Sequence, residues 1–75
     1  MAELPVVSGR AAVRAFEKAG WTYKRTTGDH MILAKPGARN NLSVPDHREL
    51  DRGILRKLIA AAGMTVDEFV ELSRR

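Results

Sequence analysis

The stretch that decides the fold of this chain runs from Trp21 to Lys35 and reads WTYKRTTGDHMILAK. Its first part, residues 21–26, alternates large aromatic with polar side chains, and its last part, residues 30–35, is a second run of strand-forming residues. The three residues between them, Thr27-Gly28-Asp29, are typical of a tight turn. The stretch therefore predicts two antiparallel strands joined by a short turn.

A helix and a third strand flank this predicted hairpin. Upstream, the apolar residues of 9–19 recur at helical spacing, and Ser8 stands before them as a suitable N-cap. Downstream, the breaker-rich residues 36–40 predict a turn, and residues 41–44 predict a short strand. Pro45 ends that strand, because proline has no backbone donor for a further ladder bond.

Two more helices complete the predicted order. Asp51 is typical of an N-cap, and the residues after it carry an amphipathic stripe that ends before Gly63. Thr65 and Glu68 have the spacing of a capping box, which predicts a short last helix. The order α-β-β-β-α with an extra C-terminal helix predicts an α+β fold, in which helices cover one face of a three-stranded antiparallel sheet.

The same periodicity predicts which side chains form the core. Strand alternation assigns Met31 and Leu33 to the core and His30 to the open face of the sheet. Trp21 and Tyr23 could instead act as platforms for stacked bases, but their alternation and the small size of the domain favour core positions. The other residues expected to be buried are Phe16, Leu42, Val44, Leu55, Leu58, Ile59 and Phe69.

Length and composition exclude several classes of protein. Seventy-five residues predict one domain over residues 1–75, and the absence of cysteine excludes disulfide scaffolds, thiolate zinc sites and cysteine nucleophiles. No apolar run approaches the roughly 20 residues that cross a bilayer. Residues 1–5 lack the basic start and apolar stretch of a secretory signal. We therefore expect no membrane association, and the composition is compatible with a reducing cytoplasm.

The charge balance favours an anionic partner. Thirteen lysine and arginine residues stand against nine aspartate and glutamate residues, which leaves a formal net charge of +4. Nine of the thirteen basic residues are arginine, whose planar guanidinium suits phosphate. Nucleic acid is the partner that this balance indicates.

Two histidines are the best candidates for chemistry, since a histidine titrates near neutral pH. The chain has no zinc-protease spacing, no glycine-rich phosphate loop and no nucleophile elbow. Asp29 beside His30, with Asp46 beside His47, could in principle bind a metal, but the chain has no metal-ligand spacing, so we expect neither a metal nor another cofactor. On pattern alone, His30 also fits a surface residue in a basic patch, and His47 fits a bend residue that bonds to the backbone.

Several fragments together resemble the HicA family of mRNA interferase toxins. The most specific are Ala19-Gly20-Trp21, Gly28-x-His30, Val44-Pro45-x-His47 and Gly53-x-Leu55. The resemblance extends over nearly the whole chain, from about residue 4 to residue 72. No single fragment is specific, but their combination in this order is.

The resemblance implies a fold like that of a double-stranded-RNA-binding domain and a role as the toxin of a type II toxin–antitoxin pair. It also implies an endoribonuclease that cuts mRNA without needing the ribosome, and an antitoxin of the HicB family as partner. The compartment that we expect is the cytoplasm. The essential histidine of the family's Gly-Ser-His motif falls on His30. The chain has Asp29 where the family usually has serine, and Ile54 where it usually has threonine. A carboxylate in that position repels phosphate, so altered activity is expected.

Metal-independent RNA cleavage uses the 2′-OH of the substrate as nucleophile, and it needs a proton acceptor, a proton donor and positive charge near the phosphorus. We expect His30 to act as the general base or general acid. His47 is the candidate for the second proton carrier. The cations expected to bind the RNA backbone are Arg10, Lys24, Arg25, Lys35 and Arg39.

Two alternatives use the same basic surface without catalysis. One is an RNA-binding module that recognises shape and phosphate alone, and the other is a protein-interaction domain whose charge meets an acidic partner. In the toxin interpretation, the antitoxin is expected to cover His30 and to form ion pairs with Arg10, Arg25 or Arg39.

Overall fold

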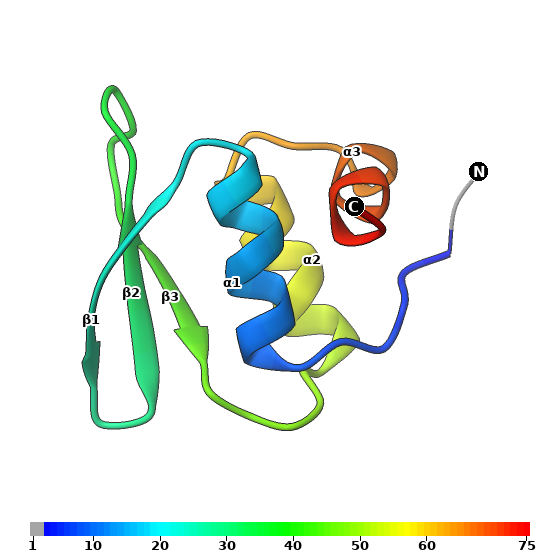
Figure 1. Ribbon diagram of the computed structural model, residues 1–75, viewed down its shortest axis with the longest axis horizontal. Helices are drawn as coiled ribbons and strands as arrows, with labels where there is room; N and C mark the ends of the chain where they lie inside the picture. The colour runs from blue at the N-terminus through cyan, green and yellow to red at the C-terminus, as the bar shows by residue number, and fades with distance from the viewer. Residues whose placement is uncertain (1–2) are drawn as a thin grey trace.

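The computed structural model describes residues 3–75 (Figure 1). Residues 1–2 lie outside the described residues, and with them the first two residues of the predicted domain and of the segment considered above as a signal. The predicted element order is confirmed, and most boundaries differ from the predicted ones by a single residue. The elements are α1 (Gly9–Lys18), β1 (Thr22–Thr27), β2 (His30–Ala34), β3 (Leu42–Pro45), α2 (Arg52–Ala61) and α3 (Val66–Ser73).

The three strands form one antiparallel sheet in the order β1-β2-β3, and the helices lie on one side of it (Figure 1). Gly28 has a φ of +61°, a region that glycine enters without strain, and this allows the tight turn between β1 and β2. The turn sets the register, so that Thr27 lies opposite His30. On the other side of β2, His30 lies opposite Pro45.

Side chains cap the three helices as the sequence predicts. The Ser8 hydroxyl accepts a hydrogen bond from the backbone of Ala11, and the Asp51 carboxylate accepts from the first turn of α2. Thr65 and Glu68 form both bonds of the capping box at the start of α3. These bonds satisfy backbone donors that a helix start leaves free, and they explain why each helix begins where it does.

One hydrophobic core lies between the sheet and the helices. This core continues between the helices, where Phe16 of α1 and Phe69 of α3 meet with ring centroids 5.3 Å apart and both side chains fully buried. Every core residue predicted above is buried except Tyr23. Met31 and Leu33 are buried and His30 is exposed, so the predicted alternation along β2 is confirmed.

The prediction that Tyr23 belongs to the core is wrong, because 42% of its surface is exposed. β1 is an edge strand, and all six of its residues are exposed. α1 faces this strand across an open groove that Tyr23 and Thr26 line, so an alternating pattern in β1 does not lead to burial. Trp21, which precedes the strand, is buried as predicted.

No helix within residues 3–75 is long and apolar enough to cross a membrane.

Candidate active site at the turn between β1 and β2

Three segments distant in sequence meet at the end of the sheet where β1 turns into β2. The backbone N–H of Asp46, just after β3, donates to the carbonyl oxygen of Asp29 in the turn, at 2.7 Å. The backbone N–H of Gly9, the first residue of α1, donates to the carbonyl oxygen of His47, at 2.9 Å. The turn, the segment after β3 and the start of α1 therefore form one corner of the molecule.

Asp29 stands between the two histidines at this corner. Its Oδ1 lies 3.0 Å from His30 Nδ1, and its Oδ2 lies 3.4 Å from His47 Nε2. The side chains of Asp29, His30 and His47 are 63%, 50% and 51% exposed, so all three are open to a large ligand. Nothing in the sequence places His47 near His30, which lies 17 positions away, and the structure brings both to one carboxylate.

The contacts to Asp29 define which ring nitrogens remain for a substrate. The carboxylate faces Nδ1 of His30, which leaves Nε2 of that ring free for other contacts. It faces Nε2 of His47, which leaves Nδ1 of the second ring. A carboxylate in contact with one ring nitrogen orients an imidazole and selects its tautomer, so the arrangement presents two oriented groups able to carry protons.

Gly9 allows the corner to close. A Cβ built on Gly9 would lie 1.9 Å from the carbonyl oxygen of Pro45 and 3.2 Å from the Cα of Asp46. No side chain fits in that space, because the atoms in the way belong to the backbone. The absence of a side chain at this position therefore lets α1 approach the segment that carries His47.

Arg10 is already engaged within the protein. Its Nε lies 3.2 Å from Asp46 Oδ1, and its Nη2 donates to Asp46 Oδ2 at 3.4 Å. This two-point pair holds the guanidinium beside the histidine corner. It also occupies two of the five N–H donors and leaves the others for a phosphate.

The other cations predicted to bind RNA divide into two groups. Arg25 lies opposite Ile32, so it occupies the same open face of the sheet as His30, and Lys24 lies beside it at a bulge in β1. Neither has an ion-pair partner within residues 3–75. Both therefore offer an unpaired charge on the strand that leads into the turn.

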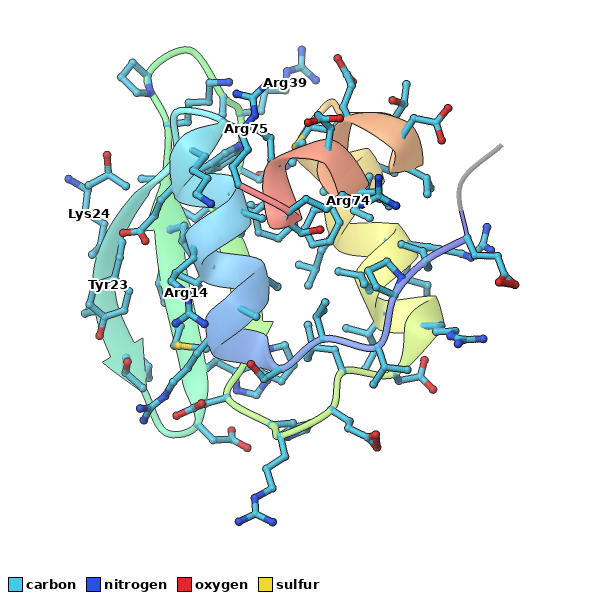
Figure 2. All side chains as sticks on the ribbon, turned by 45° about the vertical axis from the view of Figure 1, so that its right-hand side comes forward. Arg14, Tyr23, Lys24, Arg39, Arg74 and Arg75 are labelled. Atoms are coloured by element: carbon cyan, nitrogen blue, oxygen red, sulfur yellow. The ribbon has the colours of Figure 1, made fainter. Side chains whose placement is uncertain are left out.

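Lys35 and Arg39 lie at the other end of β2, away from the histidines. Lys35 follows the last residue of the strand, about 16 Å from His30 at the usual rise per strand residue. Its Nζ donates to the carbonyl oxygen of Ala19 and lies 6.0 Å from the centre of the Trp21 ring. Arg39 lies in the loop after β2, at the end of the molecule opposite the turn (Figure 2). The structure does not bring these two cations to His30.

Among residues 3–75, no group of three or more His, Asp or Glu side chains is arranged to hold a metal ion.

A family profile assigns the chain to a known group. The profile described as HicA toxin of bacterial toxin–antitoxin matches residues 9–64, from the start of α1 to beyond the end of α2. The chain therefore belongs to the HicA family of toxins. The matched range includes Asp29, His30 and His47, and it ends before α3. No curated protein matches the chain. Membership of a toxin–antitoxin family implies an antitoxin as partner.

Proposed function

We propose that this toxin is a metal-independent endoribonuclease that cuts mRNA at the corner formed by Asp29, His30 and His47. The observation that supports this most directly is the pair of histidines held on the two oxygens of one exposed carboxylate. Cleavage by an internal hydroxyl needs a proton acceptor at the attacking 2′-oxygen and a proton donor at the departing 5′-oxygen, and two histidines can supply both. They lie on a basic protein, in the part of the chain that matches the toxin family.

The proposed reaction transfers one proton at each end of the step. One histidine takes the proton of the ribose 2′-OH while that oxygen forms a bond to the neighbouring phosphorus. The bond from phosphorus to the 5′-oxygen breaks, and the other histidine gives a proton to the departing oxygen. The products are a 2′,3′-cyclic phosphate and a free 5′-hydroxyl, and no water or further reactant is consumed in this step.

Positive charge near the phosphate completes the proposed site. Arg25 shares the face of His30 and would hold the RNA backbone, while Arg10 lies beside the corner with donors left over from its pair with Asp46. Preorganised donors of this kind stabilise the charge that develops on the phosphorus oxygens. DNA lacks the 2′-OH and would not be cut. Since mRNA is the proposed substrate, the cytoplasm is the proposed compartment.

Cleavage of purified RNA by the isolated protein in the presence of a chelator tests this function. We expect strand breaks that end in 2′,3′-cyclic phosphates, because the attacking group comes from the substrate and the proton carriers from the protein. An oligonucleotide of the same sequence with deoxyribose at the cut position should stay intact. Activity that disappears with chelator and returns with a divalent cation would contradict the proposed mechanism.

We also propose that an antitoxin of the HicB family covers the histidine corner and pairs with Arg25. Arg25 is exposed, lies on the face of His30 and has no partner within residues 3–75, whereas Arg10 already pairs with Asp46. An acidic residue of the antitoxin can therefore meet Arg25 without breaking an existing ion pair. Such a contact would exclude RNA from the open face.

Arg25→Ala should weaken the complex with the antitoxin by roughly 30- to 4,000-fold, the effect of removing one member of a buried ion pair. Titration of labelled antitoxin into each variant measures it. Arg56→Ala, on the exposed side of α2, is the matched control and should leave the affinity unchanged. An antitoxin that protects α2 and leaves His30 open to RNA would contradict this proposal.

A further inference from the structure

A groove between α1 and β1 runs up to the histidine corner. Its volume is about 350 Å³, within the range of sites for small ligands, roughly 300–1,000 Å³. Arg10, Arg14 and Glu17 line it from α1, and Tyr23 and Thr26 line it from β1. At one end it reaches Asp46, whose backbone bonds to Asp29. Asp46 therefore connects this end of the groove to the turn that carries Asp29 and His30.

The bulge in β1 arranges the aromatic wall of this groove. The register between β1 and β2 shifts between Tyr23 and Arg25, so Tyr23 lies opposite Leu33 while Thr26 lies opposite Met31. Leu33 and Met31 face the helices, so Tyr23 and Thr26 share that side although three positions separate them. The Tyr23 hydroxyl and Thr26 Oγ1 lie 2.6 Å apart in a hydrogen bond. This hydrogen bond restrains the ring along the strand, and the Tyr23 side chain remains 42% exposed.

Charge gives the groove a direction. α1 begins at the histidine corner, so Arg10 lies nearest to it, Arg14 one turn further, and Glu17 about two turns away from Arg10. Arg14 has no ion-pair partner within residues 3–75. Figure 2 shows Arg14 on α1 and Tyr23 on β1 at the same level of the molecule. A phosphate is attracted to the end with the two arginines and repelled from the end with Glu17.

We propose that this groove holds one unpaired nucleotide of the RNA next to the cut position, with its base stacked on Tyr23 and its phosphate beside Arg10 and Arg14. The proposal rests on the RNA-cleaving function proposed above and adds a binding subsite to it. An exposed aromatic ring beside cations is the usual platform for single-stranded RNA, because every base has a face that stacks. Because the Tyr23 ring is already restrained, it loses little conformational entropy when a base binds.

Each substitution below is introduced into a chain that also carries His30→Ala, so that binding is measured without cleavage. The affinity is measured by titration with an unstructured, labelled RNA of about 12 nucleotides. Tyr23→Ala should weaken the affinity by about 5- to 150-fold, the contribution of one stacked base. Tyr23→Trp and Tyr23→Phe keep an aromatic ring, so their affinity for RNA should stay within about threefold of that of the His30→Ala protein. Ile54→Ala removes an apolar side chain of similar exposure on α2 and should leave the affinity for RNA unchanged.

The salt dependence separates the base from the phosphate. Arg14→Gln should reduce the slope of log affinity against log salt by about 0.7, the value of one phosphate contact to a single strand. Tyr23→Ala should leave that slope unchanged while it lowers the affinity. Arg56→Gln on the outer side of α2 is the matched control and should alter neither quantity.

Each failure points to a different error. In one outcome, Tyr23→Ala does not weaken RNA binding in the His30→Ala background, while the unsubstituted protein cuts RNA in chelator. The subsite is then wrong and the proposed function stands. If no RNA is cut but Tyr23→Ala still loses affinity, the catalytic assignment fails and the groove remains an RNA site. If Tyr23→Ala weakens only the antitoxin complex, the groove serves a protein and the proposal is overturned.

Discussion

His30→Ala is expected to lower RNA cleavage by about 10²–10⁴-fold, the contribution of one positioned proton carrier. The side chain is half exposed and lies on the open face of the sheet, so its removal should change the free energy of unfolding by no more than about 0.5 kcal/mol. Cleavage rates under single-turnover conditions and thermal melts of both proteins test the two statements. Growth arrest on expression should disappear together with cleavage.

His47→Ala and Asp29→Asn serve as companions to this variant. His47→Ala should lower the cleavage rate less than His30→Ala does. His47 makes the longer contact to Asp29, and a solvent molecule can replace its side chain as proton carrier. Asp29→Asn keeps the shape of the side chain but removes the charge that orients both rings. Cleavage that survives His30→Ala at the parent rate would contradict the site, whichever companion variant loses activity.

Gly9→Ala is expected to destabilise the protein by about 3 kcal/mol, the upper end of the usual cost of overpacking, because the new Cβ would overlap the carbonyl oxygen of Pro45. Neither the strand end nor the helix start can move without breaking the bond from the Gly9 N–H to His47. For a domain of this size, the melting temperature should fall by roughly 12–24 °C. Chemical or thermal unfolding measures the effect directly.

Gly53→Ala is the matched control, since Gly53 also lies in the first turn of a helix. A Cβ there would meet only the carboxylate of Asp51, at 3.0 Å, and that side chain can move. Its unfolding free energy should change by less than about 1 kcal/mol. Equal stabilities of Gly9→Ala and the parent protein would show that α1 does not need its close approach to Pro45.

Much of the fold follows from local patterns. The Gly28 turn with strand-forming runs on both sides specifies the first hairpin, and the capping residues Ser8 and Thr65 locate two helix starts within a residue. These features depend on neighbours in sequence, so they can be read without tertiary information. Tyr23 was misassigned for the opposite reason: alternation indicates a strand face, but whether a helix covers that face is decided by the layout of the whole molecule.

By itself, the sequence determined the element order, the faces of β2, the basic character of the chain and the family. Only the tertiary structure decided that His47 joins His30 on Asp29, that Lys35 and Arg39 lie far from them, and that Tyr23 borders an open groove. The physical reason is that periodicity along the chain tells which face of a strand or helix a side chain occupies. The distance between His30 and His47 depends instead on strand register and on the close packing of α1 at Gly9.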